Sequence, residues 1–347
     1  MTAPQRLSLD GAALAANWRA LARASGGAAC GAAVKADGYG LGVRDVVTRL
    51  LAAGCRDFFV SSWNEAAALA DLDLASAGAS LSVLHGVRDA DMTIATASQA
   101  RPVLSTSAQV RRWQGAGGGA CDVMVDTGMN RLGIAPDDIA AGLLGGVAID
   151  TLLSHLACAD EDSAMNEQQR TRFAALAGRT NARRLSLANS AGITLGVDYH
   201  FDLTRPGLAL YGGMPVPALT DVIRPVARIE AEVLQRRLVR AGETVGYNAT
   251  WVASVDTQVA IVNLGYADGY WRGFSDTGLA FAGDVQLSVI GRVSMDLVAL
   301  DVTGADVGEG DWIAFDPDLP RAARASGMSQ YELLTGLGHR FDRIWHD

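Results

Sequence analysis

Short apolar runs alternate with longer segments of helical spacing along residues 1–222. The runs are bounded by turn residues or polar side chains, which is typical of buried strands. In the first longer segment, Leu14, Trp18 and Leu21 recur at helical intervals after Asp10, whose carboxylate can cap a helix. The pattern predicts a short strand at 7–9 and strands at 29–35, 57–61, 81–85, 102–105, 121–126, 148–154, 184–188 and 206–211. It predicts helices at 43–53, 64–72, 106–113, 136–143 and 166–178.

Eight strands with intervening helices predict a (β/α)8 barrel, an α/β fold, over residues 1–222. Polar or reactive side chains stand at or just after the ends of several expected strands. Barrel enzymes carry their chemistry at that face, because the loops that follow the strands converge there. The side chains in question are Lys35, Ser61, His85, Asp126, His155 and Ser190.

The pattern changes after about residue 222. Helical spacing gives way to alternation of apolar and polar residues, as at 226–233, 259–264 and 285–290. Alternation with a period of two is typical of half-buried strands, and turn residues separate the runs. We therefore expect a second, β-rich domain over residues 223–347.

The composition narrows the classes of function. The 29 basic and 38 acidic residues give a formal charge of −9, which argues against nucleic acid or an anionic membrane as the partner. No stretch reaches the ~18 uninterrupted apolar residues of a membrane span, and residues 1–10 lack the apolar core of a signal peptide. The four cysteines show no metal-site spacing. We expect a cytoplasmic protein with reduced thiols, no bound metal and a small-molecule substrate.

Residues 31–42 carry the clearest chemistry. An apolar run ends at Lys35, and a loop with three glycines and Tyr39 follows. The glycines allow the backbone to approach a ligand closely. A lysine at the end of a buried strand suits a nucleophilic amine that holds an aldehyde as a Schiff base beside a phosphate. The alternative is a solvated lysine after an edge strand.

The string Val-Lys-Ala-Asp-Gly-Tyr-Gly-Leu-Gly from residue 34 resembles the pyridoxal 5'-phosphate (PLP) attachment motif of alanine racemases. Further strings resemble the same family from residues 126, 205, 245, 265 and 291 onward, so the resemblance covers most of the chain. It implies a PLP-binding barrel, a β domain and a homodimer. Each active site then combines the barrel of one chain with the β domain of the other.

The resemblance also implies roles for individual residues. Lys35 matches the lysine that carries PLP, and Arg205 the arginine that faces the pyridine nitrogen. His155 matches the histidine beside the pyridine ring and is expected to help hold Arg205. Tyr39, Ser190, Gly207 and Leu208 match phosphate contacts; Arg131 and Met295 match substrate contacts; Tyr247 matches the catalytic tyrosine donated across the dimer interface; Asp160, Tyr266, Arg272 and Arg292 match an entrance corridor.

These matches fit the chemistry of racemisation. Two bases are needed on opposite faces of one planar carbanion, and an amine from one domain and a phenol from another meet that requirement. We expect Lys35 to serve the α-proton of D-alanine and Tyr247 that of L-alanine. Arginine keeps its proton at any working pH, so Arg205 would leave the pyridine neutral and a weaker electron sink. The guanidinium of Arg131 suits a carboxylate, because it can make two parallel charge-assisted hydrogen bonds.

Two positions depart from the family pattern. Many relatives have a carbamylated lysine at the place of Met124, where it orients the arginine that matches Arg131. Methionine cannot be carbamylated, so Arg131 must be positioned otherwise. Near the C-terminus, His339 aligns with a corridor tyrosine of some relatives, which leaves one phosphate contact open.

Other activities fit the residues less well. A racemase of broader amino-acid specificity is the alternative within the class; secreted relatives of that kind would carry a signal peptide. A PLP decarboxylase on the same barrel would need a cysteine late in the chain, whereas all four lie before residue 159. A PLP-carrier protein would lack the second domain. A role in D-alanine biosynthesis for peptidoglycan precursors and a catabolic role both fit the sequence.

Overall fold

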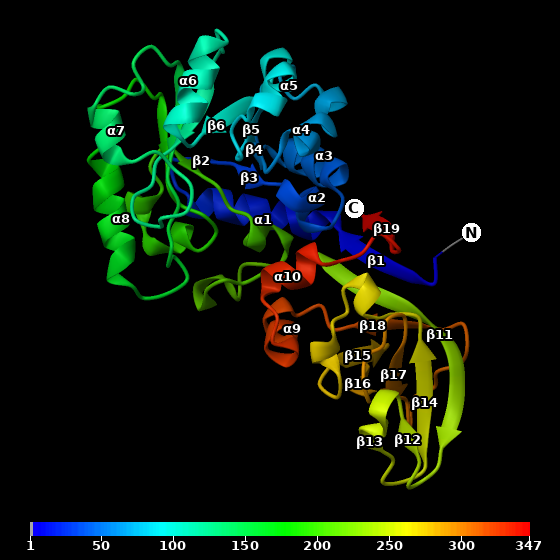
Figure 1. Ribbon diagram of the computed structural model, residues 1–347. Helices are drawn as coiled ribbons and strands as arrows, with labels where there is room; N and C mark the ends of the chain where they lie inside the picture. The colour runs from blue at the N-terminus through cyan, green and yellow to red at the C-terminus, as the bar shows by residue number, and fades with distance from the viewer. Residues whose placement is uncertain (1–2) are drawn as a thin grey trace.

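The computed structural model describes residues 3–347 and has two domains (Figure 1). A barrel of parallel strands with surrounding helices holds most of the first two thirds of the chain. A largely antiparallel sheet lies beside it, and the helices α9 and α10 lie between the two. The predicted barrel and the β-rich second domain are therefore confirmed.

The barrel consists of seven parallel strands in the order β3 to β9, closed by a short pair, β2 and β10. Gly31 lies between β2 and β3. The position requires a small residue, because a Cβ there would lie 2.8 Å from the carbonyl oxygen of Asp57. Backbone hydrogen bonds from Asp202 to Leu185 (3.0 Å) and from Arg205 to Ala188 (2.8 Å) join β10 to β9 and complete the ring. The strands are β2 Ala29–Cys30, β3 Ala32–Ala33, β4 Asp57–Val60, β5 Ser80–Val83, β6 Arg101–Leu104, β7 Cys121–Met124, β8 Ile149–Leu153, β9 Arg184–Ser186 and β10 Leu203–Thr204.

The predicted strand at 206–211 is wrong. The last barrel strand is β10, and Leu208–Tyr211 form the 3-10 helix η5. All four side chains of η5 are buried, so this short helix has the same continuous apolar run as a buried strand. Gly212, with φ at 93°, ends the helix in a conformation that favours glycine.

Most helices lie close to their predicted positions. The helix α1 (Gly11–Ala24) begins after Asp10, whose carboxylate accepts a 2.7 Å hydrogen bond from the backbone of Ala13. The helix α3 has the predicted bounds, Val43–Ala53. The others around the barrel are α4 Trp63–Ala67, α5 Met92–Ala97, α6 Ser107–Gly115, α7 Pro136–Ala140 and α8 Ala164–Ala174; α5 was not predicted.

The second domain is built on an eight-stranded sheet in the order β14-β17-β16-β15-β18-β11-β1-β19. The N-terminal strand β1 (Gln5–Asp10) belongs to this sheet, antiparallel to β11 (Ala227–Val239) and parallel to β19 (Asp342–His346). The chain therefore enters the second domain before it enters the barrel. The other strands are β14 Thr257–Val262, β15 Leu279–Ala282, β16 Val285–Ile290, β17 Val298–Asp301 and β18 Trp312–Phe315, with a separate hairpin of β12 Thr244–Val245 and β13 Trp251–Val252.

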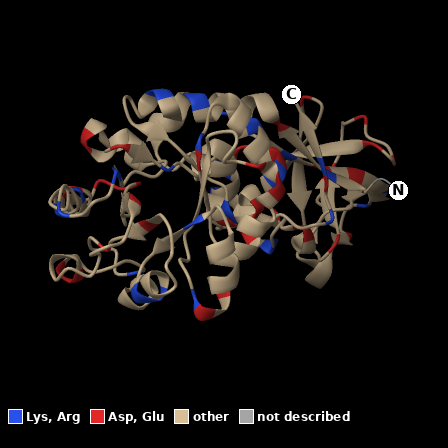
Figure 2. Cartoon of the chain, turned by 90° about the horizontal axis from the view of Figure 1, so that it is seen from above, with Lys and Arg blue, Asp and Glu red and all other residues tan. Residues whose placement is uncertain are grey.

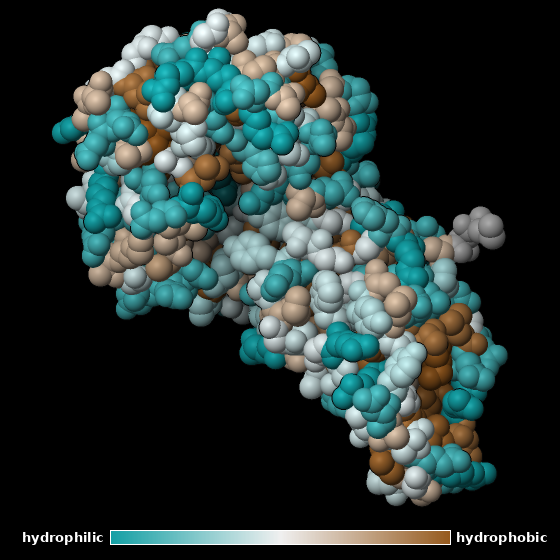
Figure 3. Space-filling model, viewed as in Figure 1, coloured by the Kyte–Doolittle hydropathy of each residue, from teal (hydrophilic) through white to brown (hydrophobic). Residues whose placement is uncertain are grey.

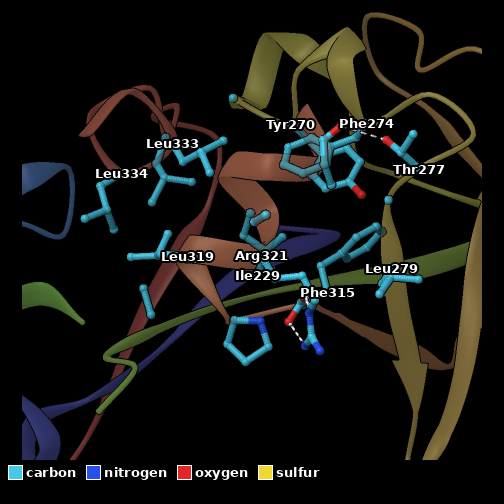
Figure 4. Close-up of a pocket in the computed structure, with 18 residues that line it drawn as sticks. Ile229, Tyr270, Phe274, Thr277, Leu279, Phe315, Leu319, Arg321, Leu333 and Leu334 are labelled. Atoms are coloured by element: carbon cyan, nitrogen blue, oxygen red, sulfur yellow. Dashed lines mark hydrogen bonds and ion pairs between the residues drawn. The ribbon is translucent and has the colours of Figure 1, made fainter. Parts of the chain in front are cut away.

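Two helices near the C-terminus connect the domains. The helices α9 (Leu319–Ser326) and α10 (Gln330–Thr335) pack against the sheet around an apolar cavity of about 100 Å³. Leu333 and Leu334 of α10 line this cavity together with Tyr270 and Phe315 from the sheet side (Figure 4). Acidic and basic residues are interspersed over both domains (Figure 2). No helix within residues 3–347 has the length and apolar character needed to cross a membrane.

Candidate active site

A cavity of about 600 Å³ opens at the carboxyl ends of the barrel strands. Eight of the ten predicted site residues line it, and they come from loops after strands spread around the ring. The eight are Lys35, Tyr39, Arg131, His155, Ser190, Arg205, Gly207 and Leu208. Ser61, His85, Asp126 and Asp160 line the same cavity. Within residues 3–347, no cluster of side chains suits a metal ion.

Lys35 stands at the start of an unusual turn. Ala36, Asp37, Gly38 and Tyr39 all have φ between 53° and 62°, which makes a short left-handed helical turn. Such a conformation costs roughly 1–2 kcal/mol for each residue that is not glycine. Strain of this kind persists only where the surroundings enforce it, and it concentrates at functional sites.

Two carboxylates hold the turn. Glu65 accepts hydrogen bonds from the backbone of Ala36 (2.8 Å) and of Ser61 (2.5 Å), so it ties the turn to the end of β4. Asp37 accepts one from the backbone of Val43 (2.8 Å) at the start of α3. The backbone of the Lys35 turn is thus tied to the end of β4 and to the start of α3.

The surroundings of the Lys35 amine disfavour its charged form. Burial and the charge of Arg131 lower the pKa of Lys35, while Glu65 opposes the shift. A lowered pKa leaves more of the amine unprotonated near neutrality, which a nucleophile or base requires. Lys35 is also the only lysine in the sequence.

A cradle for an anion lines the same cavity as Lys35. The Ser190 hydroxyl oxygen accepts hydrogen bonds from the backbone of Gly207 (3.0 Å) and Ala209 (3.3 Å). Leu208 follows at the first position of η5. The Tyr39 ring stacks on Tyr211 with centroids 4.5 Å apart, which fixes the direction of its hydroxyl.

Arg205 is buried, and no carboxylate among residues 3–347 forms a hydrogen bond with it. Its guanidinium donates to the carbonyl oxygen of Ser154 (2.6 Å) and to the hydroxyl of Ser186. Within residues 3–347 no hydrogen bond joins His155 to Arg205, whose partners lie just after β8 and in β9, so the expectation that His155 helps to hold Arg205 stays a prediction. Burial lowers the pKa of Arg205 to about 10, so the side chain keeps its proton at neutral pH.

His155 is neutral in this setting. Burial, followed by the charges of Arg205, Arg131 and Lys35, lowers its pKa to about 3. Its backbone carbonyl accepts a 2.9 Å hydrogen bond from Gln169 of α8. A neutral ring beside three cations adds no further positive charge to the cavity.

Arg131 and Met124 both line the cavity. Arg131 is exposed, and no other residue in the described part of the chain forms a hydrogen bond or ion pair with its side chain. Its guanidinium is consequently free to receive an anion.

A cavity residue that the sequence reading missed is Tyr331. It lies on α10, lines the cavity, and its ring centroid is 6.4 Å from that of Tyr39. His339, which was aligned with a corridor tyrosine, is exposed and does not line the cavity. The only pattern in the sequence near Tyr331 is the capping box of Ser329 and Glu332. A capping box indicates the start of a helix and says nothing of a binding site.

The two remaining predicted residues, Tyr247 and Met295, lie in the second domain and outside this cavity. They are 66% and 53% exposed. Tyr247 begins a short turn, η7, between β12 and β13, and Met295 lies in the loop before β17. Of the corridor residues, Asp160 lies at the barrel cavity, and the Arg272 guanidinium packs 5.1 Å from the Tyr266 ring centroid in the second domain.

Both domains of the chain match models of known protein families. Residues 9–215 match the model "Alanine racemase, N-terminal domain", and residues 226–345 match "Alanine racemase, C-terminal domain". The chain belongs to the alanine racemase family. The family is one of PLP-dependent isomerases.

Individual alanine racemases are similar over their whole length. The alanine racemase of Acidiphilium cryptum is 42% identical, with 97% of this chain and 98% of the relative covered. The biosynthetic and the catabolic alanine racemases of Agrobacterium fabrum are 40% and 39% identical, with 98% of this chain covered in both cases and 93% and 91% of the relatives. The likeness therefore does not separate the two roles.

Solved structures of alanine racemases have the same fold as this chain. The Bartonella henselae alanine racemase with covalently bound pyridoxal phosphate has a TM-score of 0.89 at 31% identity, covering 99% of each chain. The biosynthetic enzyme of Pseudomonas aeruginosa has a TM-score of 0.90 at 31% identity, covering 100% of each chain.

Proposed function

We propose that this protein interconverts L- and D-alanine with PLP bound in the barrel cavity, and that it works as a homodimer with active sites shared between subunits. The observation that carries the proposal is Lys35. It is the only lysine of the chain, its pKa is lowered, and it stands in a strained turn at the mouth of the barrel.

The residues of the cavity fit PLP. Lys35 offers the amine, and Ser190, Gly207, Leu208 and Tyr39 surround a place for the phosphate. Gly207 has room for no side chain, because a Cβ there would collide with the Tyr39 hydroxyl. When bound, PLP withdraws electrons from the α-carbon of an amino acid and so makes its proton acidic.

The protein supplies the two bases. Lys35 Nζ takes or returns the α-proton of D-alanine, and the Tyr247 hydroxyl of the partner subunit serves L-alanine from the opposite face. The ordinary pKa of tyrosine, ~10, must be lowered for this work by cations at the shared site. Lys35, Arg131 and the protonated Arg205 are the candidates in this barrel.

The exposure of the second domain supports the dimer. Apolar surface gathers there over β11 and β14 (Figure 3). Leu234 and Leu238 on β11 are 44% and 39% exposed, and Val252 beside the Tyr247 turn is 54% exposed. A second copy of the chain would cover such a patch and bring Tyr247 and Met295 to a barrel cavity.

Arginine side chains account for substrate binding and for the choice of reaction. Arg131 is free to bind the alanine carboxylate through two parallel hydrogen bonds. Arg205 keeps its proton, so it does not protonate the pyridine nitrogen of PLP. The weaker electron sink that results limits side reactions such as transamination.

The purified protein with PLP should form D-alanine from L-alanine, followed with a D-amino-acid oxidase assay. After borohydride reduction, peptide mapping should find PLP on Lys35 and nowhere else. The Lys35→Ala variant should hold no covalent cofactor. Retained covalent PLP in that variant, or lack of D-alanine formation by the parent, would refute the proposal.

A further inference from the structure

The segment Leu334–Arg343 near the C-terminus lies between two loops that belong to different parts of the proposed reaction. On one side it touches the Lys35 turn. The Arg343 guanidinium donates two hydrogen bonds to the carbonyl oxygen of Gly40, from Nε at 3.0 Å and from Nη2 at 2.9 Å. Gly40 has φ at 84° and lies close to the backbone of Leu334. This approach requires glycine, because a Cβ there would collide with the Leu334 carbonyl oxygen.

On its other side the same segment touches the loop 265–269. A Cβ at Gly269 would collide with the carbonyl oxygen of Gly336, so the two backbones are in close contact. The backbone of Gly338 donates a 3.1 Å hydrogen bond to the carbonyl oxygen of Asp268. Two glycines from separate motifs thus meet the same short segment.

Arg340 fastens this second side. Its guanidinium donates to both carboxylate oxygens of Asp268, at 2.6 and 2.9 Å, and to the carboxylate of Asp296 at 2.8 Å. Asp268 is fully buried and also accepts hydrogen bonds from the side chain of Gln5 and the backbone of Gly265, both at 3.0 Å. Removing Arg340 would leave a buried carboxylate short of a partner.

The loops joined by Arg340 carry Tyr266 and Met295. They also pair directly, since the backbone of Tyr266 donates to Ser294 and that of Ala267 to Met295, both at 3.0 Å. In the proposed dimer, on which this inference rests, these loops serve the partner's cavity. The Lys35 turn serves the chain's own cavity.

We propose that Leu334–Arg343 is a strut with one positioning residue for each of the two active sites. Arg343 holds the Lys35 turn in its own subunit. Arg340 holds the loops of Tyr266 and Met295, which act in the partner's site. Substitutions only three positions apart therefore act on different active sites of the same dimer.

Hybrid dimers test this assignment. One chain carries Lys35→Ala and the other Tyr247→Phe, each with its own affinity tag, and the hybrid is purified through both tags. Its single complete site uses Lys35 of the Tyr247→Phe chain and the second domain of the Lys35→Ala chain. Each arginine substitution is then placed in one chain or the other, and KM, kcat and the visible PLP spectrum are measured.

Arg340→Gln should raise KM for alanine about tenfold when it is in the Lys35→Ala chain, and should leave KM unchanged in the other chain. Arg343→Gln should do the reverse: in the Tyr247→Phe chain it lowers kcat and shifts the PLP spectrum. Arg340→Lys should not rescue, because an ammonium cannot reproduce the two-pronged contact. Both placements contain the same arginine substitution in one of the two chains, so a loss of folding caused by it would affect them equally.

Arg321→Gln is the matched control. It breaks another two-pronged arginine–aspartate pair of the second domain, with Asp316, and within residues 3–347 Arg321 forms no side-chain hydrogen bond with either loop. It should have no effect in either chain. Equal effects of Arg340→Gln in both placements, with an active reference hybrid, would overturn the inference alone; an inactive reference hybrid would overturn the shared site and the inference with it.

Discussion

Gly207 lies directly against the hydroxyl of Tyr39. A Cβ at this position would collide with the phenolic oxygen, and the next atoms of the ring are also close. Stacking on Tyr211 prevents Tyr39 from moving aside. The close approach of the Gly207 backbone and the tyrosine hydroxyl is what shapes the cradle proposed for the PLP phosphate.

Gly207→Ala should therefore weaken PLP binding. A methyl group there displaces the Tyr39 hydroxyl, and forcing extra atoms into packed surroundings costs about 1–3 kcal/mol, or roughly ten- to a hundredfold in affinity. Fluorescence titration of the cofactor-free protein with PLP measures the change. Gly115→Ala is the control, because a Cβ at that position meets no atom within 4 Å; equal affinities in the two variants would argue against the cradle.

Stability of the cofactor-free protein should fall as the pH drops below about 6.5, because of His155. Its pKa is lowered from 6.5 to about 3 by burial and neighbouring cations. Between these values the unfolded chain binds a proton that the folded chain does not. Each pH unit in that window therefore costs at most about 1.4 kcal/mol of unfolding free energy.

Urea denaturation between pH 7 and 5 measures this term, in a range where most carboxylates remain ionised. The His155→Asn variant should show a flatter profile than the parent. His339→Asn, at an exposed histidine, should keep the parent slope. Parallel profiles for the parent and His155→Asn would show that the folded protein protonates this ring.

Tyr247→Phe should produce an asymmetric defect in proton exchange. General acid–base groups contribute about a hundredfold or more to rate, and Tyr247 is assigned to L-alanine only. Exchange of the α-proton with deuterium from L-alanine should fall by that factor, while exchange from D-alanine falls much less. Mass spectrometry of each enantiomer, incubated separately, gives both rates.

Tyr199→Phe serves as the control for that experiment, since Tyr199 contacts Glu167 of α8 at 3.3 Å on the barrel and does not line the cavity. Both of its exchange rates should match the parent. Equal losses for the two enantiomers in Tyr247→Phe would contradict the two-base assignment.

Activity should not depend on bicarbonate or CO2. Met124 stands where relatives carry a carbamylated lysine, and the sequence offers no lysine other than Lys35 to replace it. Arg131 must be held by packing or by an anion from solution. Intact mass should show no adduct of about 44 Da, the mass of the CO2 that a carbamate adds, and activity should persist after degassing. A loss of activity restored by bicarbonate would count against this account.

Periodicity predicted the elements well where flanking residues were distinctive. The helix α3 was placed to the residue because Gly42 and Gly54, with φ at 97° and 117°, bound its apolar stripe. The family motifs, of which the string around Lys35 is one, likewise indicated eight residues that line one cavity. Neither signal revealed the left-handed turn at Ala36 and Asp37, because residues other than glycine adopt it only under tertiary constraint.

Long-range contacts account for the errors. The run at 206–211 was read as a strand because a fully buried 3-10 helix leaves no polar face in the sequence. Tyr331 was missed because α10 reaches the cavity only after the chain has crossed the second domain. The hydrogen-bond partners of Arg205 are a carbonyl and a hydroxyl, which leave no distinctive spacing in the sequence, so the motifs did not reveal them.

The position of β1 has a consequence for synthesis. It precedes the barrel in the chain, yet its neighbours β11 and β19 begin at residues 227 and 342. The nascent chain must therefore keep Gln5–Asp10 unpaired while the barrel is translated, and the strand gains its first neighbour with β11 and its second only with β19. A fragment cut between the domains would carry an orphaned strand with bare backbone edges, so the two domains cannot be separated by a single cut in the chain.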